Sequence, residues 1–222
     1  ALPISNSEDF VTANEYGVTR FKGMADKKSN VEWSYQPPST GTVTKLLADN
    51  RSEVVLTKFL RPALENINPG TPTEAIDKAI EELTRSRAHL GSIVEANKEI
   101  HSLLVSGYNY VATNESGVSE SYHVNYFDFE KPANNDFKCI SQLWITGEMH
   151  TRRPDFIIYV NGIPLILMEL KGTHRSLLDS YHDNIRDYKD TIPQIFWYNL
   201  GIILSNGITT KFGSLTSPYE FF

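Results

Sequence analysis

The segment 153–171 constrains the fold of this chain more than any other part of the sequence. Two apolar runs, 156–160 and 163–168, flank Asn161 and Gly162, a dipeptide typical of tight β-hairpin turns. Because both faces of these runs are almost wholly apolar, both faces of the predicted strands should be buried. The sequence therefore predicts a hairpin that is covered by other parts of the chain.

Charged residues gather only at the open end of this predicted hairpin. Asp155 begins the first strand, and Glu169 and Lys171 end the second. A two-residue turn would pair residue 155 with 168 and turn Glu169 to the opposite face. A three-residue loop over 161–163, or an equivalent bulge, pairs 155 with 169 and places all three charged groups on one face. We predict the second arrangement.

Such a trio has a chemical use as well as an ordinary interpretation as a solvated strand edge. Two adjacent carboxylates repel each other unless a cation lies between them, and Mg²⁺ accepts such ligands together with water and substrate phosphate. The backbone carbonyl of Leu170 is a further candidate ligand. Lys171 can orient an attacking water or stabilise charge that develops on a phosphate. The pattern predicts a metal-dependent nuclease site.

The rest of the chain fits one α/β domain with an N-terminal helical portion, assigned to residues 41–222. Residues 1–40 look irregular, but Tyr16, Phe21, Trp33 and Tyr35 favour packing on the core. We expect a helix from about Glu53 to Leu64, a helix capped by Thr71, a helix over 93–104 and a polar helix over 177–189. Further strands are expected at 108–113, 122–128, 137–145, 200–205 and 209–212.

Composition excludes several classes of protein. Cys139 is the only cysteine, which excludes an internal disulfide and a zinc site built on cysteine pairs. No apolar run is long enough for a membrane span and no signal pattern begins the chain, so a cytoplasmic protein without membrane partners is expected.

The net charge of −6 is a poor match to a protein that binds DNA unaided, so other subunits or domains should supply much of the affinity for DNA. Trp144, Phe196, Trp197 and Tyr198 are expected mostly in the core rather than on a surface that stacks on bases.

Several sequence words around the hairpin resemble one nuclease family. Pro154-Asp155 with Glu169-Leu170-Lys171 resembles the PD-(D/E)xK motif. The chain is similar over roughly 50–222 to the N-terminal endonuclease domain of type I restriction enzyme R subunits. The matching words are Arg51-Ser52-Glu53-Val54-Val55-Leu56, Leu60-Arg61-Pro62-Ala63-Leu64, Asn134-Asn135-Asp136-Phe137, Arg153-Pro154-Asp155, Val160-Asn161-Gly162-Ile163-Pro164-Leu165, Ile192-Pro193-Gln194-Ile195-Phe196 and Ser205-Asn206-Gly207.

The resemblance implies a PD-(D/E)xK fold, with a mixed central sheet flanked by helices, and cleavage of double-stranded DNA that depends on Mg²⁺, for which Mn²⁺ can substitute. In such enzymes an ATP-driven motor follows in the same chain, and modification and specificity subunits join the complex. No Gly-x-x-x-x-Gly-Lys-Ser/Thr phosphate loop occurs here, so ATP is expected only in a longer subunit of which this chain is a fragment.

Carried over by position, the resemblance makes Asp155 and Glu169 metal ligands and Lys171 the catalytic lysine. It also suggests Glu53, expected on the first helix, as a further acidic ligand. The family's Gln-x-x-x-Tyr helix motif matches Asn184 and Tyr188, so a shorter amide replaces the glutamine. That departure puts the contact made by the amide in doubt.

Two other functions remain open from the sequence. One is a stand-alone repair or junction-resolving nuclease of the same fold, which a strongly basic surface or a dimer face would favour. The other is a non-catalytic module that clamps DNA or docks onto the motor, with vestigial carboxylates. The intact Asp155, Glu169 and Lys171 favour the enzyme.

Overall fold

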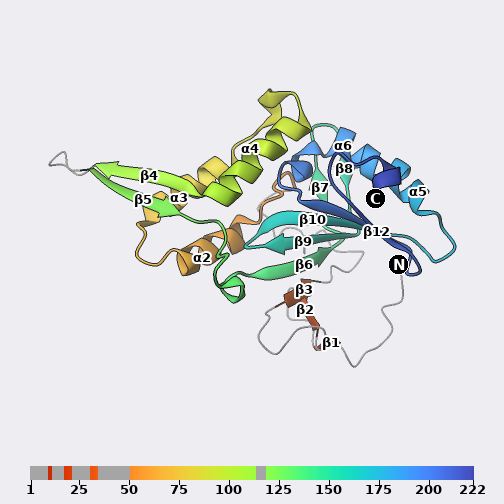
Figure 1. Cartoon of the computed structure of the whole chain (residues 1–222), viewed down its shortest axis with the longest axis horizontal. Helices are drawn as coiled ribbons and strands as arrows, with labels where there is room; N and C mark the ends of the chain where they lie inside the picture. Colours follow the sequence, from red (N-terminus) through yellow and green to blue (C-terminus); the bar gives the residue numbers. More distant parts are fainter. Residues whose placement is uncertain (1–9, 12–17, 22–30, 35–50, 114–118) are drawn as a thin grey trace.

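The predicted hairpin forms the centre of a mixed β-sheet in the computed structural model (Figure 1), which describes residues 10–11, 18–21, 31–34, 51–113 and 119–222. The strand order is β1-β2-β3-β6-β9-β10-β11-β12. These strands are β1 (Phe10–Val11), β2 (Val18–Phe21), β3 (Val31–Ser34), β6 (Phe137–Ser141), β9 (Phe156–Val160), β10 (Ile163–Leu170), β11 (Gly201–Ser205) and β12 (Thr210–Gly213). Strand β10 pairs antiparallel with β9 and parallel with β11, so the central sheet is mixed.

Helices flank this sheet, which confirms the predicted α/β class. They are α2 (Thr57–Ile67), α3 (Thr73–Thr84), α4 (Ile93–Ser106), α5 (Leu177–Ser180), the π-helix η3 (Tyr181–Arg186) and α6 (Asp187–Thr191), with short 3-10 turns η1 (Ala88–Leu90), η2 (Pro132–Asn134), η4 (Pro193–Trp197) and η5 (Tyr219–Phe221). Two small hairpins stand apart from the main sheet: β4 (Tyr108–Thr113) with β5 (Ser119–Val124), which extends outward beside α3, and β7 (Ile145–Thr146) with β8 (Thr151–Arg152) (Figure 1).

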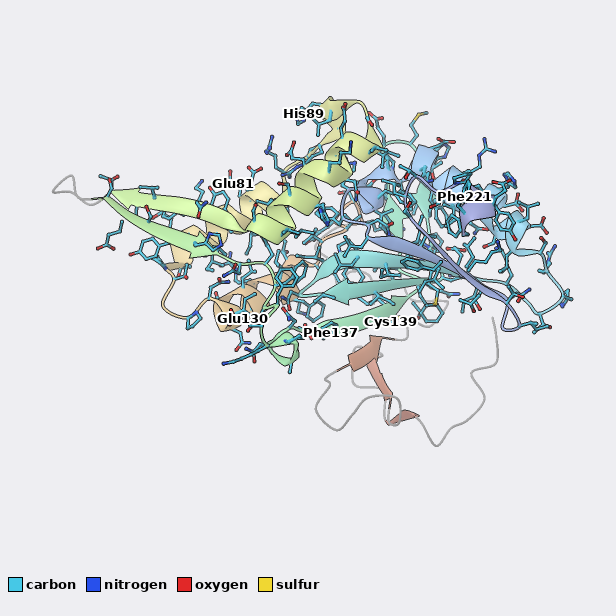
Figure 2. The ribbon with its side chains drawn as sticks, viewed as in Figure 1. Glu81, His89, Glu130, Phe137, Cys139 and Phe221 are labelled. Atoms are coloured by element: carbon cyan, nitrogen blue, oxygen red, sulfur yellow. The ribbon has the colours of Figure 1, made fainter. Side chains whose placement is uncertain are left out.

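The hydrophobic core lies between the helices and the central strands. Side chains from α2, α3 and α4 pack with those of β9, β10, η4 and β11 in one continuous buried cluster. Cys139 is buried on β6 (Figure 2), and burial raises the pKa of its thiol, consistent with an inert structural cysteine. None of the described helices is both long and apolar enough to cross a bilayer.

Two helix starts differ from the sequence prediction. Helix α2 begins at Thr57, so Glu53 lies in the segment before the helix rather than on it. The Leu56 backbone N–H donates to the Gly162 carbonyl at 2.8 Å, and this contact with the hairpin turn holds the segment outside the helix. Helix α3 begins at Thr73 with Pro72 at the capping position and no side-chain cap, so the predicted cap by Thr71 is wrong.

The hairpin register is the one that brings the charged ends together. The turn has two residues, with φ of 52° at Asn161 and 76° at Gly162. The pairing then shifts between Pro164 and Ile166, and this irregularity places Met168 opposite Phe156. Residue 169 is consequently level with residue 155, so the equivalent bulge that we predicted is confirmed, and the three-residue loop is not used.

The turn itself is fixed by buried hydrogen bonds at the end of the hairpin far from the charged groups. Asn161 is fully buried; its amide donates to the Tyr126 carbonyl at 2.8 Å and accepts from the Asp136 backbone at 2.7 Å. A Cβ added at Gly162 would come within 2.5 Å of the Leu56 carbonyl oxygen. Several of the short sequence motifs that carry the resemblance therefore lie together at this turn, where they form its hydrogen bonds and close packing.

The N-terminal region contains more regular structure than the sequence suggested. Within residues 1–40, expected to be irregular, three short strands extend the sheet, and β3 runs parallel to β6. Tyr16 and Tyr35 fall outside the described residues. The division into segments 1–40 and 41–222 stays a prediction.

Candidate active site

The bulged register brings Asp155 and Glu169 into direct contact. The Glu169 side chain is 1% exposed, whereas Asp155 is partly exposed. The Asp155 backbone N–H donates to Glu169 Oε1 at 3.2 Å, and the Leu170 N–H donates to Asp155 Oδ2 at 2.8 Å. Each carboxylate is thus held by the backbone of the opposite strand, which fixes the pair with a buried side and an open side.

Electrostatics at this pair favour a cation. Burial, and after it the charge of Asp155, raises the pKa of Glu169 to about 8, although hydrogen bonds from the Asp155 backbone and Tyr188 and the charge of Lys171 act in the opposite direction. A buried acid beside a like charge is stabilised when a cation binds between the two. The donor set therefore fits a hard divalent ion such as Mg²⁺.

The remaining ligands of such an ion would come from elsewhere. Among the residues that the structure describes, no group of three or more His, Cys, Asp or Glu side chains is arranged to hold a metal. The N–H and C=O of one residue point to the same edge of a strand, so the Leu170 carbonyl projects on the side where its N–H meets Asp155. Two carboxylates, one carbonyl, water and phosphate form a set that Mg²⁺ accepts.

Lys171 is held beside the acidic pair by the helix that follows. Its Nζ donates to Asn184 Oδ1 at 2.8 Å, and Asn184 Nδ2 donates to the Tyr188 hydroxyl at 3.2 Å. The Tyr188 hydroxyl lies near the Glu169 carboxylate, and each of these groups influences the pKa of the other. Glu169, Tyr188, Asn184 and Lys171 therefore form one connected network, in which the shorter asparagine still reaches the lysine.

The helix that carries Asn184 is not a regular α-helix. The helix expected over 177–189 is present, but α5 changes to the π-helix η3 before α6 continues to Thr191. Asn184 lies within η3, while Ile185 and Tyr188 are buried against the core. π-Helical turns occur frequently at functional sites, and this one carries the amide that binds Lys171.

Glu53 is placed differently from the acidic pair. Its carboxylate accepts hydrogen bonds from the Thr57 backbone at 3.2 Å and from the Thr57 hydroxyl at 2.7 Å, at the start of α2. Burial, and after it the Glu53 carboxylate, raises the pKa of the Tyr159 hydroxyl, so Glu53 lies near Tyr159, toward the turn end of β9. Its role as a metal ligand stays a prediction.

No local sequence pattern indicated how the β7–β8 hairpin supports the site. Arg152 forms an ion pair with Asp187 of α6, and Gln194 Nε2 donates to the Thr146 carbonyl at 2.9 Å. A Cβ at Gly147 would overlap the Thr191 carbonyl oxygen, so the hairpin packs directly on the end of α6. These contacts join residues far apart in the chain, and only Gln194 belonged to a sequence word that we had singled out.

The aromatic residues divide between core and surface. Phe196 and Tyr198 are buried in the core, as expected, whereas Trp144 and Trp197 are only partly buried. Trp144 lies beside the site, because the Gln142 N–H donates to the Asp155 carbonyl at 2.9 Å just before Trp144 in the chain.

Comparisons with known proteins identify one family and several relatives. Residues 22–221 match the family model described as Type I restriction enzyme R protein N terminus. The chain is 34% identical over 181 residues to the Type I restriction enzyme HindI endonuclease subunit of Haemophilus influenzae, covering 80% of this chain and 17% of that protein. It is 27% identical over 221 residues to a putative type I restriction enzyme MjaIXP endonuclease subunit of Methanocaldococcus jannaschii, covering 97% of this chain and 20% of that protein.

The matches cover most of this chain, but the chain spans at most a fifth of the length of these two relatives. The family model covers almost the whole chain, including all the residues of the candidate site. The chain belongs to the family of type I restriction enzyme R proteins, of which it represents the N-terminal region.

Proposed function

We propose that this chain is the Mg²⁺-dependent endonuclease domain of a type I restriction enzyme R subunit and hydrolyses phosphodiester bonds in double-stranded DNA. The observation that carries the proposal is the convergence of Asp155, Glu169 and Lys171 at one end of a buried hairpin. Backbone hydrogen bonds from the opposite strand hold the two carboxylates, and Asn184 holds the lysine. Membership of the family supports it, because the relatives named above are endonuclease subunits.

The protein groups have distinct roles in this proposal. Asp155, Glu169 and the Leu170 carbonyl would hold Mg²⁺ or Mn²⁺, and the ion would supply a water of lowered pKa and neutralise charge on the phosphate. Lys171 directs its ammonium toward the reacting phosphate, where it orients the water and stabilises the added negative charge. Asn184 and Tyr188 fix the lysine and the glutamate relative to each other.

The partners follow from the family rather than from the site. We propose that the ATP-driven motor domains belong to a longer chain, that modification and specificity subunits complete the complex, and that it acts in the cytoplasm on foreign DNA. The chain's share of its relatives, 17% and 20%, favours such a subunit over a stand-alone repair nuclease.

Calorimetric titration of Mg²⁺ and Mn²⁺ into the chain tests the metal site directly. The wild type should bind, and Asp155→Asn should lose binding because one of the two carboxylates is neutralised. Asp179→Asn removes an exposed carboxylate on α5 and should leave binding unchanged. A short DNA duplex should be included in a second titration, because substrate phosphate completes the coordination of Mg²⁺.

Each result of this titration has a definite meaning. Binding that is lost in Asp155→Asn alone supports the nuclease site. Binding that survives in Asp155→Asn, or no binding with and without duplex, would contradict the proposal and favour a non-catalytic module that clamps DNA or docks onto the motor.

Asn184→Ala should lower the turnover of DNA cleavage by roughly tenfold and leave metal binding unchanged. The reason is that Lys171 Nζ loses the acceptor that holds it at 2.8 Å, while Asp155 and Glu169 are untouched. Relaxation and linearisation of a supercoiled plasmid would measure the rate, with Lys171→Met as the reference for complete loss of the ammonium. Asn184→Gln should retain turnover, since it keeps the amide. Equal rates for Asn184→Ala and wild type would exclude this positioning role.

A further inference from the structure

Two arginines lie over one tryptophan ring beside the candidate active site. The guanidinium carbon of Arg153 lies 5.0 Å from the centroid of the Trp144 ring, and that of Arg51 lies 5.7 Å from it. Both distances are inside the roughly 6 Å range of a cation–π contact. We refer to Arg51, Trp144 and Arg153 as the arginine–tryptophan cluster.

The cluster is tied to the acidic pair through the backbone. Arg153 precedes Asp155 by two residues, and the Gln142 N–H, two residues before Trp144, donates to the Asp155 carbonyl at 2.9 Å. Arg51 belongs to a segment much earlier in the chain. Its backbone carbonyl accepts a hydrogen bond from the Thr146 N–H at 2.7 Å, which holds it close to Trp144. Three segments thus bring their side chains together next to the site.

The supporting backbone is held in place on several sides. The β7–β8 hairpin between Trp144 and Arg153 is joined to α6 by the Arg152–Asp187 ion pair and to η4 by the Gln194–Thr146 hydrogen bond. Because these contacts fix the β7–β8 hairpin, the cluster presents its charges in a fixed position. This lowers the entropy cost of binding a partner.

The chemistry of a stacked guanidinium favours one kind of partner. An arginine that lies over an aromatic ring uses its flat face, and its N–H donors point outward in the plane, where they suit a phosphate group. Trp144 is partly buried and Arg51 is exposed, so the cluster reaches the surface. The cluster thus places two cations next to the acidic pair, in a chain whose net charge is −6.

We propose that the arginine–tryptophan cluster binds the phosphate backbone of duplex DNA next to the bond to be cut. This inference rests on the proposed nuclease function and adds to it the residues that hold the substrate strand. The contacts are to phosphates, so they confer affinity and position without reading the base sequence.

The proposal is tested by duplex binding without metal, in a Glu169→Gln background in which position 169 is uncharged at every pH. Fluorescence anisotropy of a labelled duplex in EDTA, across a series of salt concentrations, gives the affinity and its salt dependence. The variants are Arg51→Gln/Arg153→Gln, the charge-retaining Arg51→Lys/Arg153→Lys, and Arg61→Gln as control. Arg61 lies on α2, which follows the Leu56 contact with the hairpin turn at the opposite end of β9 from Asp155.

The expected result is specific to phosphate contacts. The double glutamine variant should bind roughly 100-fold more weakly, and the slope of log K against log salt should be shallower by about 2, one for each lost phosphate contact. The double lysine variant should recover the slope, and Arg61→Gln should match the parent. If the double glutamine variant fails to fold, Arg51→Gln alone should show about half the change in slope.

Three results would overturn the inference: a parent that does not bind duplex, a double glutamine variant with the affinity and slope of the parent, or an equal loss in Arg61→Gln. None of these depends on the metal titration of Asp155→Asn. Failure of the cluster and failure of the nuclease site are therefore distinguishable.

Discussion

Replacing Glu169 by glutamine is expected to abolish metal-dependent DNA cleavage, by a factor of roughly 10³ or more, and to stabilise the metal-free domain at alkaline pH. Cleavage is lost because an amide is a poor ligand for Mg²⁺ compared with a carboxylate. Stability rises because the glutamine has no charge to bury beside Asp155. The two effects should therefore have opposite signs in one variant, as expected where a strained site serves function.

The direction of the pH dependence follows from the proton balance. The pKa of Glu169 is about 8 in the folded chain and near 4.5 for an ordinary glutamate, so the folded state holds a proton between these values that the unfolded state has released. The stability contributed by this proton is complete below about pH 4.5 and is lost as pH rises through 8. Above pH 8 the wild type buries a charge and the variant does not.

Thermal unfolding from pH 5 to 9 measures this difference. The melting temperatures of Glu169→Gln and wild type should be close at pH 5, and the variant should be more stable by roughly 5–10 °C at pH 9, since each unit of pKa shift corresponds to about 1.4 kcal/mol. Mg²⁺ should raise the melting temperature of the wild type but not that of Glu169→Gln. Glu148→Gln, which removes an exposed glutamate of the β7–β8 turn, is the control. Parallel pH profiles for Glu169→Gln and wild type would contradict the burial of a strained acid.

Arg87→Met is expected to lower the free energy of unfolding by about 3–5 kcal/mol. The Arg87 side chain is fully buried, and it lies in the connection between α3 and α4. Its guanidinium donates to the carbonyls of Glu82 and Leu83 at the end of α3, and to the carboxylates of Glu82 and Glu99. Methionine fills much of the volume and leaves these acceptors without their buried donor.

Arg85 provides a matched control for this prediction. It binds the same two carboxylates, Glu82 at 2.9 Å and Glu99 at 3.1 Å, but its side chain is 49% exposed. Water can replace its hydrogen bonds, so Arg85→Met should cause a much smaller loss. Urea unfolding of both variants measures the difference. Similar losses for Arg85→Met and Arg87→Met would show that the ion pairs, rather than the buried carbonyl contacts, determine the effect.

The sequence determined the class of the fold and the centre of the sheet. The apolar runs around Asn161-Gly162 specified the hairpin, because only buried strands tolerate apolar residues on both faces. Helical spacing predicted α3 and α4 to within a few residues. The predicted pairing of residues 155 and 169 also depended on sequence alone, since side chains alternate along a strand and a register shifted by one residue turns the charges to opposite faces.

Local signals failed where tertiary contacts override them. The segment 53–56 has apolar residues at helical spacing, yet Leu56 donates its N–H to Gly162 and the helix begins only at Thr57. The strands within residues 1–40 exist because β3 pairs with β6, about a hundred residues later in the chain. Neither contact could be predicted from the local pattern of residues.

The candidate site was likewise predicted from the sequence only in part. The sequence identified Asp155, Glu169 and Lys171, because their charge at the end of an apolar hairpin is conspicuous. Only the tertiary structure decided that a bulge rather than a longer loop sets their register, and that a π-helix brings Asn184 to Lys171. It also decided the burial that raises the pKa of Glu169 and the meeting of Arg51 with Arg153 on Trp144. Burial and contacts between distant segments depend on how the whole chain packs, and no short stretch of sequence contains that information.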